Sequence, residues 1–273
     1  MDLRNKSKEL RKTIVKTICN GGGGHISASL SVVEILAVLY CNIMNVNSEN
    51  LTDENRDRFI LSKGHAGVAL YAVLADCGFF DKKHLDTFGK SGTILGGHPD
   101  MYKVPGVEAS TGALGHGFPF GVGVALSGKL DKKDYRVFCV IGDGECQEGS
   151  IWEAALFASQ HKLDNLVTVV DFNKLQAMDK LDEIVSLEPL VDKWKSFGWE
   201  VREVDGHNID DLEVIFKSAP FVNNKPNLII AHTVKGKGIS FMENQAIWHY
   251  RMLNKEEMKV ACRDLGLPPH QLL

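Results

Sequence analysis

The stretch VFCVIGDGECQEGSIWEA, residues 137–154, decides the fold together with NLVTVVDFNKLQ, residues 165–176. Both stretches begin as apolar, largely β-branched runs, which are typical of buried strands, and both runs end at polar residues. A helical pattern over Ile151–His161 separates them. Because a strand, a helix and a second strand follow one another so closely, this order predicts a βαβ unit with parallel strands.

The rest of the chain repeats this alternation. Strand-like runs occur at Phe59–Ser62, Arg136–Ile141, Leu166–Asp171, Trp199–Val204 and Asn227–His232. Further helical patterns occur at Val68–Cys77, Phe118–Lys129, Pro189–Phe197 and Asp210–Lys217. We therefore expect an α/β fold with a mainly parallel sheet flanked by helices, and we expect residues 1–273 to form a single domain.

Two helices are predicted before the first strand. Leu10, Ile14 and Ile18 recur at four-residue spacing, which places them on one face of a helix near the N-terminus, over Lys6–Cys19. A second helix is predicted to begin near Ser31. The reason is that Ser31-Val-Val-Glu34 has the spacing of a capping box ahead of an apolar run.

The composition is that of an ordinary soluble enzyme, with 44% hydrophobic and 24% charged residues. A formal net charge of -4 gives no reason to expect nucleic acid or an anionic membrane as a partner. No apolar run approaches the roughly 20 residues of a membrane helix, and the first residues lack the pattern of a secretory signal. The six cysteines include no Cys-x-x-Cys pair, so we expect buried free thiols and a cytoplasmic location.

The residues that directly follow the predicted strands are candidates for a site. Parallel α/β sheets bind ligands at the carboxyl ends of their strands, where the loops meet helix N-termini. Folding alone would require only turn formers there, yet the chain supplies His, Asp and Asn. The segments concerned are Lys63-Gly64-His65, Gly142-Asp143-Gly144, Phe172-Asn173-Lys174 and Thr233-Val234-Lys235.

Asp143 and Asn173 are thirty positions apart, a distance that one strand–helix–strand unit spans while returning to the same sheet edge. Mg²⁺ prefers oxygen ligands, which Asp143, Asn173 and a backbone carbonyl near Leu175 would supply beside diphosphate and water. Gly142 and Gly144 would let the backbone approach a diphosphate. Gly-Asp-Gly alone is more typical of a turn. The second strand, the Asn and the spacing together favour the metal site.

Two other glycine patterns imitate nucleotide-binding motifs. The glycine that follows Gly142 and Gly144 is Gly149, which is too late for the dinucleotide fingerprint. The P-loop-like run that ends at Lys129 is followed by Leu130 instead of Ser or Thr, and it precedes a strand instead of following one. These departures disfavour a nicotinamide dehydrogenase and exclude a P-loop.

Six segments, in order over nearly the whole chain, resemble the N-terminal, diphosphate-binding half of transketolase, a thiamine diphosphate enzyme. They are GGGGHISASLS (21–31), LSKGHAGVALYA (61–72), LGGHPD (95–100), STGALGHG (110–117), GDGECQEGSIWEA (142–154) and AIWHYR (246–251). The resemblance implies the thiamine diphosphate-binding fold. It also implies transfer of a two-carbon ketol unit from a ketose to an aldose, with sugars or sugar phosphates as substrates.

The resemblance also implies roles for individual residues. His25 and His98 would face sugar hydroxyls, His65 would lie between diphosphate and substrate, and His249 would assist proton movement near the cofactor's amino group. Cofactor contacts are implied for His65, Gly112, Ala113, Leu114, Gly142, Asp143, Gly144, Glu145, Asn173 and His249. The implied ligands of Mg²⁺ or Ca²⁺ are Asp143, Asn173 and the carbonyl of Leu175. Glu148 and Glu153 match acidic residues at a contact between subunits.

The family's pyrimidine-binding and C-terminal domains have no counterpart in this chain. The chain therefore resembles the N-terminal subunit of a split transketolase, whose partner is a separate C-terminal subunit in an α2β2 assembly. Lys174 and Met178-Asp179 depart from the family pattern, and the family's residues that grip a sugar phosphate lie mostly in the other half, so the donor and acceptor sugars stay open. Tyr250-Arg251 departs from the small residues that usually follow the histidine at position 249.

Two other interpretations stay open at this point. One is another split thiamine diphosphate enzyme, of the deoxyxylulose phosphate synthase or oxo-acid dehydrogenase type. The other is a non-catalytic scaffold subunit with the same fold. His25 and His98 favour a ketose donor over an oxo acid, and a scaffold would not need Asp143, Asn173 and His65.

Overall fold

The computed structural model describes residues 2–268. Within this range, five strands form one parallel sheet in the order β1-β2-β3-β5-β4. Each strand lies within one residue of its predicted bounds, and the predicted mainly parallel sheet is confirmed. The strands are β1 Arg58–Leu61, β2 Val137–Gly142, β3 Leu166–Phe172, β4 Glu200–Asp205 and β5 Asn227–His232.

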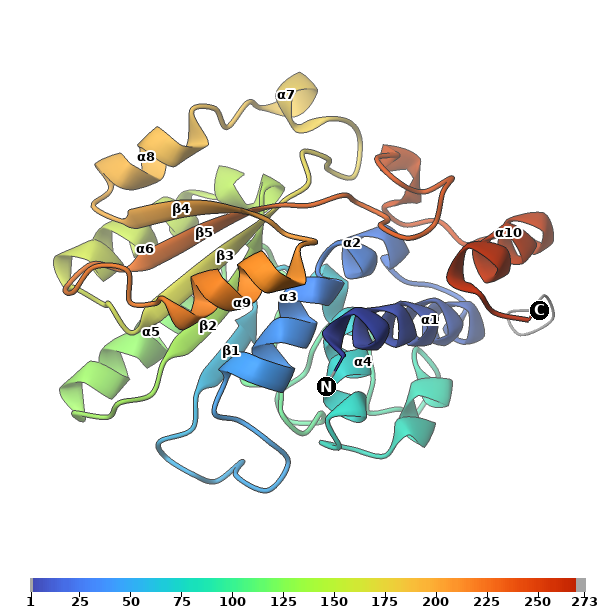
Figure 1. The fold of residues 1–273 in the computed structure, drawn as a ribbon, viewed down its shortest axis with the longest axis horizontal. Helices are drawn as coiled ribbons and strands as arrows, with labels where there is room; N and C mark the ends of the chain where they lie inside the picture. Colours follow the sequence, from blue (N-terminus) through green and yellow to red (C-terminus); the bar gives the residue numbers. More distant parts are fainter. Residues whose placement is uncertain (1, 269–273) are drawn as a thin grey trace.

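Helices connect the strands, and further helices lie before the first strand and after the last one (Figure 1). Before β2 lie α1 Leu3–Gly21, α2 Ile26–Ser31, α3 Val33–Val38, α4 Gly67–Asp76 and α5 Gly117–Leu130. After it follow α6 Gly149–Gln160, α7 Leu181–Ile184, α8 Leu190–Ser196, α9 Ile209–Lys217 and α10 Lys255–Leu265. The remaining helical elements are the π-helix η1 Leu39–Ile43 and the 3-10 helices η2 Gly64–Ala66, η3 Lys82–Thr87, η4 Gly144–Gln147 and η5 Ala246–Trp248.

The central strands β2 and β3 are buried along their whole length, which explains why they read as continuous apolar runs, whereas the edge strand β4 is partly exposed. Successive side chains of a strand point to opposite faces. Phe138 and Val140 of β2 pack in one layer with α1, α3, α4 and α9, whereas Cys139 and Ile141 pack in the other with α5, α6 and α8. The two layers in Figure 1 therefore follow from the period of two along each strand.

A helix does begin near Ser31, because α3 starts at Val33, but the predicted capping box is wrong: the residue before α3 is Val32, and no side chain caps this helix. The first of two short helices begins at Ile26, and the chain breaks at Val32 before α3 starts. The Ser31 hydroxyl donates to the Asp171 carboxylate, 2.7 Å away, while the Glu34 side chain is engaged by α1. Tertiary partners thus take both side chains that the local motif would have used.

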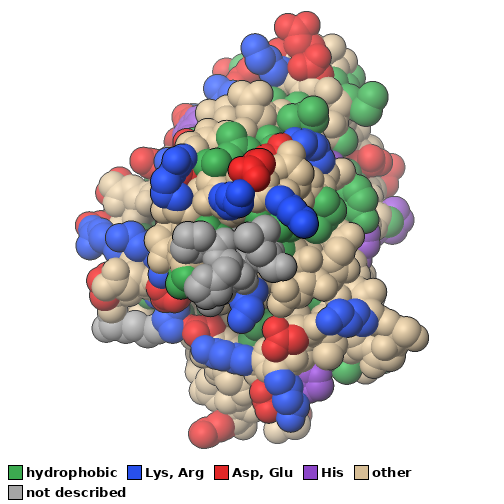
Figure 2. All heavy atoms as spheres, turned by 90° about the vertical axis from the view of Figure 1, so that its right-hand side faces the viewer, with side chains coloured by type: hydrophobic (Ala, Val, Ile, Leu, Met, Phe, Trp, Pro, Cys, Tyr) green, Lys and Arg blue, Asp and Glu red, His purple; other side chains and the backbone are tan. Residues whose placement is uncertain are grey.

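The molecular face that carries α10 mixes charges of both signs. Lysine and arginine side chains there are interspersed with aspartate and glutamate (Figure 2). Two ion pairs at this helix, Lys259 with Glu256 and Arg251 with Glu257, account for part of this mixture. In the described part of the chain, no helix combines the length and the apolar character that crossing a membrane would require.

Glu34 is the acidic member of a buried cluster that joins α1 and α3 to the loop before α9. Arg11 donates to its two carboxylate oxygens at 2.5 and 2.7 Å, and His207 Nδ1 lies 2.9 Å from the second. Burial alone would raise the pKa of Glu34, but the hydrogen bonds from His207 and Arg11 and the charge of Arg11 outweigh burial and lower the pKa to about 2.

We expect Glu34→Gln to lower the free energy of unfolding at pH 7 by about 3 kcal/mol, because it leaves the Arg11 guanidinium buried without a counter-charge. The native pKa of Glu34 lies below its ordinary value. The stabilisation is therefore complete above about pH 5 and is lost as the pH falls toward 2. Urea unfolding at pH 7 and pH 3 measures both effects.

The matched control is Glu9→Gln on α1, where the carboxylate is largely exposed in its pair with Lys12. This change should move stability by less than about 0.5 kcal/mol. A Glu34→Gln variant as stable as the parent at pH 7, or one whose deficit is the same at both pH values, would contradict the assignment.

Candidate active site

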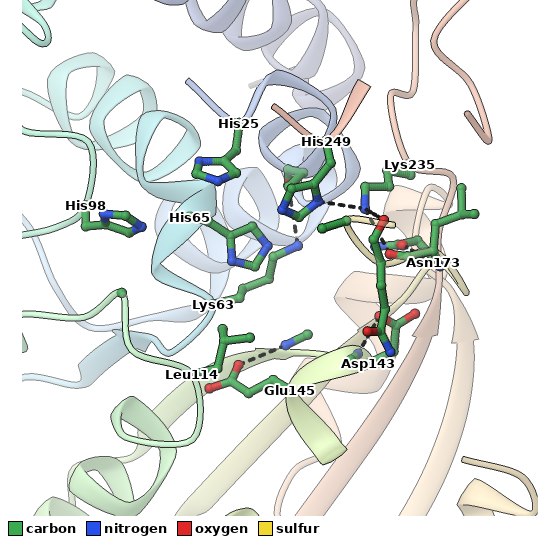
Figure 3. A pocket seen from close by; sticks show the side chains of 17 residues that line it. His25, Lys63, His65, His98, Leu114, Asp143, Glu145, Asn173, Lys235 and His249 are labelled. Carbon is green, nitrogen blue, oxygen red and sulfur yellow. Dashed lines mark hydrogen bonds between the residues drawn. The ribbon is translucent and has the colours of Figure 1, made fainter. Parts of the chain in front are cut away.

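A cavity of about 280 Å³ lies at the carboxyl ends of the central strands (Figure 3). It is lined by all but one of the residues predicted to form the site, namely His25, His65, His98, Gly112, Leu114, Gly142, Asp143, Gly144, Glu145, Asn173, Leu175 and His249. Ala113 lies on the same loop, but it is exposed and is not part of this lining. Its contact with a cofactor ring stays a prediction.

The four predicted histidines form one cluster, although they come from four separate segments. The ring of His25 has its centroid 5.4 Å from that of His65, 5.9 Å from that of His98 and 5.1 Å from that of His249. The rings of His65 and His249 are 5.5 Å apart. In Figure 3 these rings border one side of the cavity, opposite the carboxylates.

At least three of these imidazoles are neutral at pH 7. Burial is the largest cause, and the positive charges of Lys63 and Lys235 add to it. Together they lower the pKa of His25 to about 4, that of His249 to about 3 and that of His65 well below its usual value. A neutral imidazole carries one donor and one acceptor nitrogen, so it can pass a proton in either direction.

Lys235 determines which nitrogen of His249 carries the proton. Its ammonium lies 3.1 Å from His249 Nδ1 and also donates to the carbonyls of Leu175, at 2.9 Å, and Gln176, at 3.1 Å. Burial and the nearby Lys63 lower the pKa of Lys235 to about 8, which leaves it mainly charged at pH 7. His249 Nδ1 is therefore an acceptor, and its Nε2 carries the hydrogen.

Asp143 is a buried carboxylate at the end of β2. Its Oδ1 accepts from Gly144 N–H at 2.7 Å and its Oδ2 from Lys174 N–H at 2.6 Å. Burial, followed by the charge of Asp171, raises the pKa of Asp143 to about 6 despite these two bonds. A cation beside this carboxylate would relieve the cost of its charge.

The other two predicted metal ligands lie on the loop after β3. Asn173 Oδ1 accepts from Leu175 N–H at 3.1 Å, and Asn173 Nδ2 donates to Asp171. With Asp143, they offer a carboxylate, an amide oxygen and a backbone carbonyl to one cavity. Hard oxygen donors of this kind fit Mg²⁺ or Ca²⁺. Among residues 2–268, no three His, Cys, Asp or Glu side chains gather as an alternative metal site.

Glu145 lines the cavity, but its carboxylate is occupied by the protein itself. One oxygen accepts from the Ser62 hydroxyl and from Gly115 N–H, and the other accepts from Gly142 N–H. These bonds tie the end of β1, the loop before α5 and the end of β2 together. Its predicted cofactor contact stays a prediction, while its structural role as a link between three loops is visible in these bonds.

Gly112 is required by the position of His98. Its φ is 145°, which side-chain-bearing residues rarely adopt, and an added Cβ would lie 2.9 Å from the His98 ring. The glycine therefore lets the loop before α5 lie directly against the histidine. The STGALGHG segment and the LGGHPD segment are packed on one another at this point.

Sequence reasoning gave no role to three buried residues of this region. Lys63 is 1% exposed, Lys235 is 2% exposed and Asp171 is fully buried. Lys63 and Lys235 follow predicted strands, which was a signal for the site, but the spacing did not show that their ammonium groups reach the cavity. Asp171 was predicted only as the last residue of a strand.

The predicted subunit-contact residues, Glu148 and Glu153, lie at the start of α6, and both are exposed. Four large apolar side chains are exposed on α5 and α6: Phe120 at 45%, Leu130 at 72%, Leu156 at 58% and Phe157 at 42%. Exposed apolar groups of this kind are common at interfaces. The contact itself stays a prediction.

Residues 4–273 match the family described as "Transketolase, thiamine diphosphate binding domain". The chain is 44% identical to an apulose-4-phosphate transketolase subunit of Phocaeicola vulgatus, over 97% of this chain and 94% of that protein. It is 43% identical to the 6-deoxy-6-sulfo-D-fructose transketolase subunit SqwG of a Clostridium species, over 97% of this chain and 96% of that protein.

Longer transketolases share the same fold. The transketolase of Campylobacter jejuni superimposes with a TM-score of 0.92 at 31% identity, over 98% of this chain and 43% of that one. Human transketolase is 39% identical over 93% of this chain and 40% of its own length. The chain therefore spans about two fifths of these proteins. On its sequence, its fold and the arrangement of its cavity, the chain belongs to the transketolase family and is its thiamine diphosphate-binding domain.

Proposed function

We propose that this chain and a separate partner subunit together transfer a two-carbon ketol unit from a ketose donor to an aldose acceptor. Family membership supplies the reaction type. The observation that carries the site is the convergence of four histidines, Asp143 and Asn173 on one cavity. The relatives named above are transketolase subunits, which favours this function over an oxo-acid dehydrogenase, a deoxyxylulose phosphate synthase or a scaffold.

When bound, thiamine diphosphate supplies an acidic ring carbon and an electron sink for the transferred unit. The protein must hold the sugar hydroxyls and move protons. Neutral imidazoles suit this work because each carries one donor and one acceptor nitrogen, so it can bind a sugar hydroxyl and take up one proton as it releases another. We assign His25 and His98 to sugar hydroxyls, His65 to the region between diphosphate and sugar, and His249 Nε2–H to proton transfer near the cofactor's amino group.

Two lysine side chains place positive charge at the end of the cavity where we expect the diphosphate to bind. Lys63 and Lys235 bring two buried ammonium groups to the cavity, and Gly142 and Gly144 leave backbone surface open beside them. Bound metal would complete the neutralisation of a diphosphate. We propose Asp143, Asn173 and the Leu175 carbonyl as the protein ligands of Mg²⁺, with Lys235 sharing the carbonyl through its hydrogen bond.

The partner that we propose is a separate C-terminal transketolase subunit, in an α2β2 assembly that contains residues 1–273 as one domain. Two relatives of similar length are each named as one subunit of a transketolase, and the exposed apolar side chains of α5 and α6 provide a surface for a contact between copies. All six cysteines are free, which suits a cytoplasmic location.

The sugar substrates require a direct test, because relatives of similar identity are named for different sugars. One is named for apulose 4-phosphate and another for 6-deoxy-6-sulfo-D-fructose. We propose a ketose or ketose phosphate donor, and we leave its identity to a panel of donors and aldose acceptors. No nucleic acid or membrane is part of the proposed function.

Asp143→Asn should weaken metal-dependent binding of thiamine diphosphate by at least about 100-fold, because it removes the charged metal ligand. The fold should be retained. Because burial raises the pKa of Asp143 to about 6, its ionisation lowers stability between about pH 4 and pH 6, and the loss is complete above that range. Without metal, the amide should therefore raise the unfolding free energy at pH 7 by up to about 3 kcal/mol. Calorimetric titration and urea unfolding measure the two effects.

The control for this variant is Asp86→Asn, at an exposed position outside the cavity. It should change neither cofactor affinity nor stability measurably. Unchanged metal and cofactor affinity in Asp143→Asn would refute the metal site.

The chain alone should bind the cofactor weakly and transfer no ketol unit, because relatives of this length are named as one subunit of a transketolase. Addition of the partner that co-purifies from the native cell extract should restore transfer from a ketose but not from pyruvate. Chromatographic analysis of the sugar products over a donor panel measures this. Turnover by the chain alone would overturn the two-subunit proposal, and turnover of pyruvate by the complex would overturn the ketose donor.

A further inference from the structure

Asp171, near the end of the central strand β3, receives hydrogen bonds from four side chains that come from different parts of the chain. The donors are the hydroxyl of Ser31 at 2.7 Å, the amide of Asn173 at 3.1 Å, the ammonium of Lys63 and the hydroxyl of Thr233. Asp171 itself is fully buried and does not line the cavity. Two of its donors, Lys63 and Asn173, do.

This carboxylate fixes the orientation of the Asn173 amide. An ionised carboxylate only accepts hydrogen bonds, so Asn173 must turn its NH2 group toward it. The amide is planar, and its oxygen therefore points away from Asp171. In the structure that oxygen accepts from Leu175 N–H, and its second lone pair stays available. Without such a partner, an amide can present either end to a ligand.

We propose that Asp171 is a positioning residue, which holds Asn173 with its oxygen toward the metal site and holds the Lys63 ammonium beside it. The inference rests on the metal site proposed above and adds the group that orients it. Partners behind metal ligands commonly act in this way, and their loss typically costs 10–100-fold in metal affinity.

The four donors also provide a matched comparison. Ser31 and Thr233 bind Asp171 but do not line the cavity, whereas Asn173 and Lys63 do both. If Asp171 served the fold alone, loss of a hydrogen bond from any of the four donors would have no specific effect on metal affinity. If it positions the metal site, only the bonds to the lining residues affect metal affinity.

The test measures binding of Mn²⁺ in the presence of thiamine diphosphate by electron paramagnetic resonance, with urea unfolding alongside. The complete chain is used together with any subunit that co-purifies with it. Asp171→Asn should weaken Mn²⁺ binding by about 10–100-fold. Ser31→Ala is the control: it removes one hydrogen bond from the same carboxylate and should leave Mn²⁺ affinity within about twofold, whatever it does to stability.

A second test exchanges the side chains at positions 171 and 173, and it does not require the Asp171→Asn variant to fold. Asn173→Asp alone adds a negative charge to the metal site, but it places a carboxylate against Asp171, so we expect weaker Mn²⁺ binding. The double variant D171N/N173D restores an amide opposite a carboxylate and retains the net charge of the parent. Its Mn²⁺ affinity should return to within about tenfold of the parent and exceed that of Asn173→Asp.

The outcomes separate the inference from the function on which it rests. A parent chain that binds no Mn²⁺ with thiamine diphosphate overturns the metal site, and the positioning role with it. A parent that binds while Asp171→Asn binds equally well overturns the positioning role alone. If Asp171→Asn does not fold, the comparison of N173D with the double variant decides: restored affinity supports the role, and no restoration overturns it.

Discussion

The functional end of this domain depends on charged side chains that are buried beside the sheet. Lys63, Asp143, Glu145, Asp171 and Lys235 are each at most 3% exposed. A buried charge is costly unless it is paired and hydrogen-bonded. Each of the three carboxylates accepts at least two hydrogen bonds from backbone or side-chain donors. The hydrogen bonds to these buried charges hold the loops after the strands in one conformation, as apolar packing holds the strands themselves.

The same buried charges determine the protonation of the histidines. Burial is the main cause that lowers the pKa values of His25, His65 and His249, and the two lysines lower them further. Lys63 is paired with Asp171, and Lys235 is bonded to two carbonyls and to His249. A pair of cations suited to an anionic ligand therefore also keeps the imidazoles neutral, in the form that can relay protons.

The order of the strands explains how distant segments supply one site. In the order β1-β2-β3-β5-β4, the end of β3 lies between the ends of β2 and β5. The long side chain of Lys63 reaches Asp171 from the exit of β1 across the end of β2, and Thr233 reaches it from the exit of β5. A carboxylate on the central strand can thus bind donors from both sides, which an edge strand could not provide.

Apolar runs predicted four of the five strands because strands buried on both faces carry little else, whereas the edge strand β4 is partly exposed and mixes apolar with charged residues. Motif positions also predicted most of the cavity lining. The capping box predicted at Ser31 was wrong, and the roles of Lys63 and Lys235 were not predicted. Both errors have one cause, which is that the side chains involved bind partners that are distant in sequence. Asp171 is 140 positions from Ser31 and 108 from Lys63, so no local spacing reports either contact.

One signal for Asp171 was nevertheless present in the sequence. It stands in VVDF, at the end of a run that is apolar enough to be buried on both faces. A carboxylate at such a position must find several donors, or its charge would destabilise the fold. The donors nearest to the end of a parallel strand are the residues that follow neighbouring strands, and in parallel α/β sheets ligands bind at that edge. An acidic residue that ends a doubly buried strand therefore indicates a positioning role before its partners are known.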